Sequence, residues 1–103
     1  MTTSAPPKAT YRVIDAYDHP HGGRILRLRL GKGEALRVKE LKSCVMAATA
    51  PDGREERFSV DGFALFGGRP SDSRLARTGR VDVHATDEAA RLVEVGWTLA
   101  GPA

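Results

Sequence analysis

RILRLRLGKGEALRVKELK, residues 24–42, holds two runs in which apolar and mostly basic residues alternate around a glycine-containing turn. A period of two is typical of a strand that buries one face, so we expect the two runs to pair as an antiparallel hairpin. In the register that such a turn favours, Leu30 lies opposite Leu36 and Leu28 lies opposite Val38. The hairpin interpretation therefore predicts an apolar inner face.

The outer face of this expected hairpin is basic. The same register sets Arg29 opposite Arg37 and Arg27 opposite Lys39, and like charges directly across a ladder destabilise a sheet. We therefore expect an anionic group nearby, either one of the protein's own carboxylates or a bound ligand, and the sequence leaves both open. The candidate polyanion-binding residues are Arg27, Arg29, Arg37 and Lys39.

Short strands separated by turns recur along the rest of the chain, and no window carries a sustained helical stripe of apolar residues. We expect an all-β fold, a small single-domain antiparallel β-barrel of six to seven short strands over residues 11–100, after a disordered leader at 1–10. A sandwich is the alternative. The expected strands are 11–17, 24–30, 36–42, 44–48, 54–60, 80–84 and 92–99. Residues 63–66 either complete a strand or close a barrel end, 67–74 form a loop, and 86–88 cap one helical turn.

The clearest turn in the chain is APDG at residues 50–53, which suits a type I turn with Gly53 in the left-handed conformation. Pairing of the flanking strands sets Met46 opposite Phe58 on an inward apolar row. A chain of 103 residues is long enough for one modest core. The residues expected in that core are Cys44, Met46, Phe58, Val60 and Trp97.

The segment YRVIDAYDHPHGGRILRLRLGKG, residues 11–33, consists of a strand, a glycine-containing turn and a second strand that ends in a glycine-bounded loop. In this rhythm it resembles the opening of the β-barrel second domain of translational GTPases. The similarity covers about a quarter of the chain. It implies a barrel fold and carries no implication of translation activity.

Candidate metal-binding and catalytic residues are few. His19 and His21 are two residues apart and could hold a transition metal with His84 or Asp18, but an exposed turn explains them without a metal. Cys44 is expected in the core, where a thiol is inert. The loop at residues 67–74, which begins with two glycines, lacks the Lys-Ser/Thr of a Walker motif. We therefore expect no metal, no cofactor and no enzymatic activity.

Charge is unevenly divided along the chain. Residues 1–42 carry nine Lys or Arg against four acids, whereas residues 43–103 carry seven against nine, for a net charge of +3 overall. We therefore expect a small non-enzymatic binding barrel that uses the basic hairpin face on a polyanion such as RNA. Two alternatives remain: a protein-interaction or assembly module with no nucleic-acid role, and a small-ligand or enzymatic domain that uses the loops at residues 19–23 and 67–74.

Two surface features separate these alternatives. A basic face with Tyr11 or Tyr17 beside it favours nucleic acid, whereas an exposed apolar strand edge favours a protein partner. The chain has no apolar stretch long enough for a membrane span, and it contains a single cysteine. We therefore expect a cytoplasmic protein without a disulfide framework.

Overall fold

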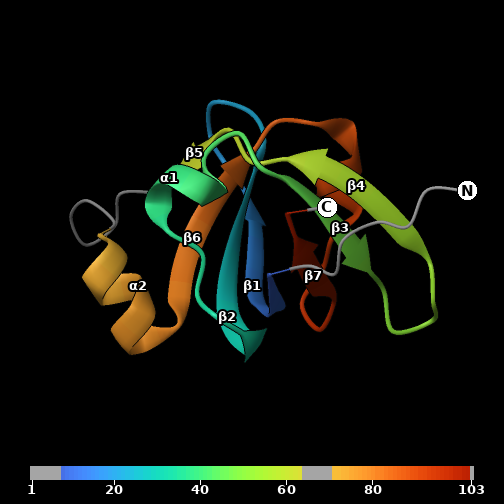
Figure 1. Ribbon diagram of the computed structural model, residues 1–103. Coiled ribbons are helices and arrows are strands. Elements are labelled where there is room, and N and C mark those ends of the chain that lie inside the picture. Colours follow the sequence, from blue (N-terminus) through green and yellow to red (C-terminus); the bar gives the residue numbers. More distant parts are fainter. Residues whose placement is uncertain (1–7, 64–70, 103) are drawn as a thin grey trace, which may run out of the picture.

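Seven antiparallel strands form one curled sheet in the computed structural model, which describes residues 8–63 and 71–102. The order across the sheet is β4-β3-β7-β1-β2-β6-β5. Three short helical segments complete the described chain (Figure 1). The strands are β1 (Ala9–Asp18), β2 (Arg24–Gly33), β3 (Val45–Thr49), β4 (Glu55–Ser59), β5 (Gly62–Phe63), β6 (Arg80–Ala85) and β7 (Thr98–Gly101). The helices are α1 (Val38–Leu41), α2 (Asp72–Thr78) and the 3-10 helix η1 (Glu88–Leu92).

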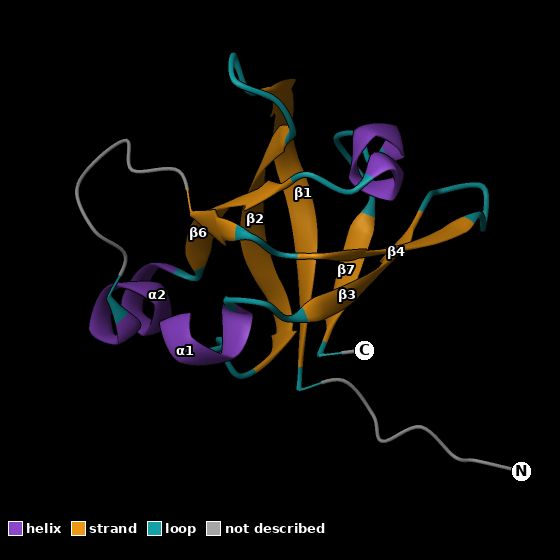
Figure 2. Cartoon of the chain, turned by 90° about the horizontal axis from the view of Figure 1, so that it is seen from above, coloured by secondary structure: helices purple, strands orange, loops and turns teal. Residues whose placement is uncertain are grey.

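The sheet curls into a half-barrel around its own interior (Figure 2). Its two edge strands, β4 and β5, follow one another in the sequence with only Val60 and Asp61 between them. The chain therefore passes directly from one edge of the sheet to the other. The expected all-β, barrel-type antiparallel fold is confirmed.

One hydrophobic core fills the inside of the sheet, and the core expected from the sequence is confirmed. Met46 pairs with Phe58 across β3 and β4, and both side chains are buried. The expected turn is also present, since Gly53 has φ +95° and its N–H donates to the Ala50 carbonyl at 2.9 Å. The expected core residues that the structure buries in one cluster are Cys44, Met46, Phe58, Val60 and Trp97.

The prediction of a hairpin within residues 24–42 is wrong. The strand β2 pairs with β1 on one side and with β6 on the other, so it takes no partner from residues 36–42. The spacing of Val38 and Leu41 suits a helical turn, which places Leu41 in the core. Glu40 supports the start of α1 by accepting the Arg37 backbone N–H at 3.2 Å.

Other boundaries differ from the expected ones for local reasons. The helix α2 begins within the segment expected to be a loop, because the Ser71 hydroxyl accepts the Arg74 N–H at its first turn. The last strand is shorter than expected and begins only at Thr98, since η1 and a turn occupy the residues before it. Strand β1 begins at Ala9, inside the expected leader, whereas residues 1–7 and 64–70 lie outside the described chain.

Candidate functional site

Three arginines form a straight row across the outer face of the sheet. Arg29 of β2 lies opposite Arg12 of β1 on one side and opposite Arg80 of β6 on the other. All three side chains are exposed, while the neighbouring positions on each strand face the core. Within residues 8–63 and 71–102, no carboxylate lies within ion-pair distance of any of the three guanidinium groups. We call Arg12, Arg29 and Arg80 the arginine row.

The turn between α2 and β6 sets Arg80 in this row. Gly79 ends α2 in the left-handed conformation, with φ +66°, and its N–H donates to the Leu75 carbonyl at 2.8 Å. Its own carbonyl accepts the Leu30 N–H at 2.6 Å. A Cβ at Gly79 would lie 3.2 Å from the Leu30 Cβ, so this close approach also favours glycine. The turn thereby fixes the start of β6 beside β2.

The next row along the strands is acidic at both ends. Asp15 of β1 and Asp82 of β6 flank Arg27 of β2. The Arg27 Nε lies 3.0 Å from one Asp82 carboxylate oxygen and its Nη2 lies 3.3 Å from the other, a bidentate contact. This hydrogen bond raises the pKa of Arg27. The charge of Arg27 is therefore neutralised within the protein.

A β-bulge in β1 decides which residues of this strand share the face of the arginine row. The pairing with β2 shifts by one residue between Val13 and Asp15, so Ile14 is extra. Before the bulge even-numbered residues such as Arg12 face outward, and after it Asp15 and Tyr17 do. The bulge thus brings an aromatic ring to the outer face.

Beyond the acidic row, a third row carries rings. Tyr17 and His84 flank Ile25, which is only 1% exposed although it lies outside the main core cluster. The His19 ring lies 4.8 Å from that of His84 and 5.6 Å from that of His21, centroid to centroid. Partial burial, with Asp82 nearby, raises the pKa of Tyr17. We call Tyr17, His19, His21 and His84 the ring patch.

Hydrogen bonds hold two rings of this patch in place. The His84 Nε2 lies 2.9 Å from the Gly22 carbonyl oxygen, and the His21 backbone N–H donates to the His19 Nδ1 at 3.1 Å. The structure therefore brings together the three histidines that the sequence offered as metal ligands. In the described part of the chain, however, no three His, Cys, Asp or Glu side chains are placed to hold a metal ion.

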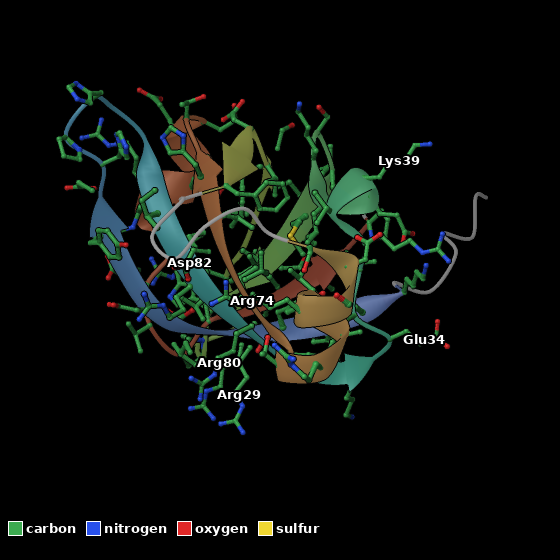
Figure 3. All side chains as sticks on the ribbon, turned by 90° about the vertical axis from the view of Figure 1, so that its left-hand side faces the viewer. Arg29, Glu34, Lys39, Arg74, Arg80 and Asp82 are labelled. Atoms are coloured by element: carbon green, nitrogen blue, oxygen red, sulfur yellow. The ribbon has the colours of Figure 1, made fainter. Side chains whose placement is uncertain are left out.

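The four residues of the candidate polyanion site do not come together. Arg29 lies beside Arg80, whereas Lys39 lies well apart from both, on the helix α1 (Figure 3). Arg37 precedes the same helix, and Arg27 is bound to Asp82. The predicted oppositions of Arg29 with Arg37 and of Arg27 with Lys39 are therefore wrong, because β2 pairs with β1 and β6 instead.

Sequence reasoning missed Arg12 and Arg80. Each stands next to a core residue in an alternating run, so its outward orientation was readable from the pattern. Their position opposite Arg29 was not readable, because it depends on which strands are neighbours and on their register.

Two other reactive or charged side chains serve the fold. Burial raises the pKa of the Cys44 thiol, which is consistent with an inert core cysteine. Arg24 is 8% exposed and donates to the Val93 carbonyl, the Asp18 carboxylate and the Glu94 carboxylate. Each of its three guanidinium nitrogens therefore has an acceptor at this end of the sheet.

Comparisons of the chain with protein-family models, with curated proteins and with solved structures find no match. The resemblance to the barrel of translational GTPases therefore stays an expectation from sequence rhythm. Over residues 8–63 and 71–102, no helix has the length and apolar character needed to cross a membrane.

Proposed function

We propose that this protein is a non-enzymatic binding module that holds a polyanion, RNA in the first instance, on the arginine row. The observation that carries the proposal is the direct opposition of Arg29 to both Arg12 and Arg80 without a described carboxylate partner. Like charges placed across two successive ladders destabilise the free protein by a few tenths of a kcal/mol per pair. An anionic ligand removes this repulsion.

The chemistry of the row suits phosphate groups. Neighbouring strands lie about 4.8 Å apart, so three adjacent arginines span about 10 Å. Arginine offers a planar fork of donors that binds phosphate oxygens bidentately, and its charge does not titrate. A nucleic acid with several phosphates can therefore meet all three side chains at once.

The position of Tyr17 favours a nucleic acid over a protein partner. Tyr17 lies on the same outer face as the arginine row, whereas Tyr11 is 1% exposed and its hydroxyl accepts the Leu36 N–H. Bases stack on aromatic rings, and proteins that bind single strands combine such rings with a basic surface. The face carries both features.

A binding assay with charge-reversal variants tests the proposal. We expect the wild type to shift generic RNA in a gel at low salt and to lose the shift as salt rises. Arg29→Glu weakens this binding strongly. Lys39→Glu is the matched control, because it changes the net charge equally at an exposed site away from the row. Equal losses in both variants contradict the proposed site, and no binding by the wild type favours a protein-interaction module.

A further inference from the structure

We infer that the polyanion is a single strand, whose phosphates meet the arginine row while one or more of its bases stack on the ring patch. This inference rests on the proposed function and names the ligand class of the same face. Its basis is the order of the three rows along β2: arginines at Arg29, acids beside Arg27, and rings beside Ile25.

The spacing of the rows fits a strand that runs along β2. Ile25 lies four positions before Arg29 on β2, which is about 13 Å at about 3.3 Å per residue. Arginine row and ring patch therefore lie within the reach of a few nucleotides. The bulge at Ile14 is what makes this arrangement possible, because without it Tyr17 would face the core.

The acidic row between the two sites argues against a duplex. Asp15 and Asp82 outnumber Arg27, so this row carries a net negative charge beneath any ligand that crosses it. A duplex lying flat on the face would bring phosphates over these carboxylates, and its paired bases would have no free faces for the rings. A single strand can turn its unstacked bases toward the protein there.

Two rings of the patch, those of His19 and His84, are oriented before any ligand arrives. The hydrogen bonds of His84 to Gly22 and of the His21 N–H to His19 restrict two of them, and Ile25 packs beneath the patch. Rings that are already oriented lose less conformational entropy when a base binds. The patch is therefore suited to stacking. It is also exposed to solvent at His21.

The test compares three probes: a short single-stranded oligoadenylate, a duplex of the same strand with its complement, and inorganic polyphosphate. We expect the wild type to bind the single strand more tightly than the duplex. Tyr17→Leu is expected to weaken oligoadenylate binding about tenfold, in line with the loss of one stacked base, and to leave polyphosphate binding unchanged. Tyr17→Phe keeps the ring and is expected to bind oligoadenylate like the wild type.

The outcomes separate this inference from the proposed function. If Tyr17→Leu lowers the affinity for oligoadenylate and polyphosphate equally, or lowers neither, stacking on the ring patch is contradicted while the arginine row stands. If the wild type prefers the duplex, the single-strand assignment is contradicted. If Arg29→Gln leaves polyphosphate binding unchanged, the proposed function itself fails. A thermal melt of each variant ensures that folded proteins are compared.

Discussion

Arg29 lies directly opposite Arg80 in the ladder between β2 and β6, and both side chains are exposed on the outer face of the sheet. One row away, Arg27 is bound by Asp82 through two hydrogen bonds. The same pair of strands therefore holds one arginine neutralised and the next one facing another arginine. This contrast separates the structural charge from the charge that is available to a ligand.

Reversal of the central charge of the row is expected to stabilise the free protein. In Arg29→Glu, the cross-strand interactions of residue 29 with Arg12 and Arg80 become attractive instead of repulsive. We expect the free energy of unfolding in urea to rise by a few tenths of a kcal/mol. Lys39→Glu, which has no such neighbours in a ladder, is expected to give no rise. A loss of stability in Arg29→Glu would mean that the row is already neutralised.

Removal of the carboxylate that binds Arg27 is expected to enlarge the basic surface. Asp82→Asn leaves Arg27 without its ion-pair partner, so RNA binding is expected to tighten. The slope of log affinity against log salt is expected to steepen by close to the amount that one phosphate contact contributes. Fluorescence anisotropy over a salt series measures both. Glu34→Gln makes the same change of net charge at an exposed residue away from the row (Figure 3). An equal effect of Glu34→Gln would assign the gain to net charge alone.

The sequence predicted the kind of fold and much of the core, because these depend on patterns within each strand. The pairing of Met46 with Phe58 follows from a turn that is fixed by local residues. The pairing of strands that are far apart in the sequence could not be predicted from such patterns, so Arg80 was not expected beside Arg29. The alternation of residues 36–42 also fits a helical turn, and in so short a run the two periods are hard to distinguish.

The candidate site was only partly predictable for the same reason. Arg29 was named from its own strand, but its neighbours depend on the register of three strands. The outward position of Tyr17 depends on one extra residue in β1, and a bulge of this kind leaves no clear mark in the sequence.

Loss of the aromatic ring at the centre of the core is expected to unfold the protein. Phe58 is 2% exposed and pairs with Met46, so Phe58→Ala creates a cavity and costs about 3–5 kcal/mol. That is near the whole stability of a small domain. Circular dichroism measures the loss of structure. Cys44 offers an independent check: in the native wild type, where it is buried, it is expected to react slowly with a thiol reagent, and rapid reaction would contradict this core.

Tyr11 is expected to make stability fall at alkaline pH. Burial is the main cause that raises the pKa of its hydroxyl above the ordinary value of 10.0. Above pH 10.0 the folded state therefore keeps a proton that the unfolded state loses. The contribution of this hydroxyl to the free energy of unfolding is fully present below pH 10.0 and is lost as pH rises toward the folded-state pKa.

The variant Tyr11→Phe tests this dependence. It removes the acceptor of the buried Leu36 N–H, which costs about 1–2 kcal/mol at neutral pH. We expect the difference in unfolding free energy between wild type and variant to shrink above pH 10.0, where the wild-type tyrosine ionises on unfolding. A difference that stays constant with pH would contradict the burial of this hydroxyl.

The most direct measurement for the proposed function is the salt dependence of single-stranded RNA affinity in the wild type and in the triple variant Arg12→Gln, Arg29→Gln, Arg80→Gln. Each phosphate contact on a single strand contributes about 0.7 to the slope of log affinity against log salt. We therefore expect the triple variant to bind more weakly and its slope to be shallower by about two. An unchanged affinity and slope in a variant that melts like the wild type would contradict polyanion binding on the arginine row.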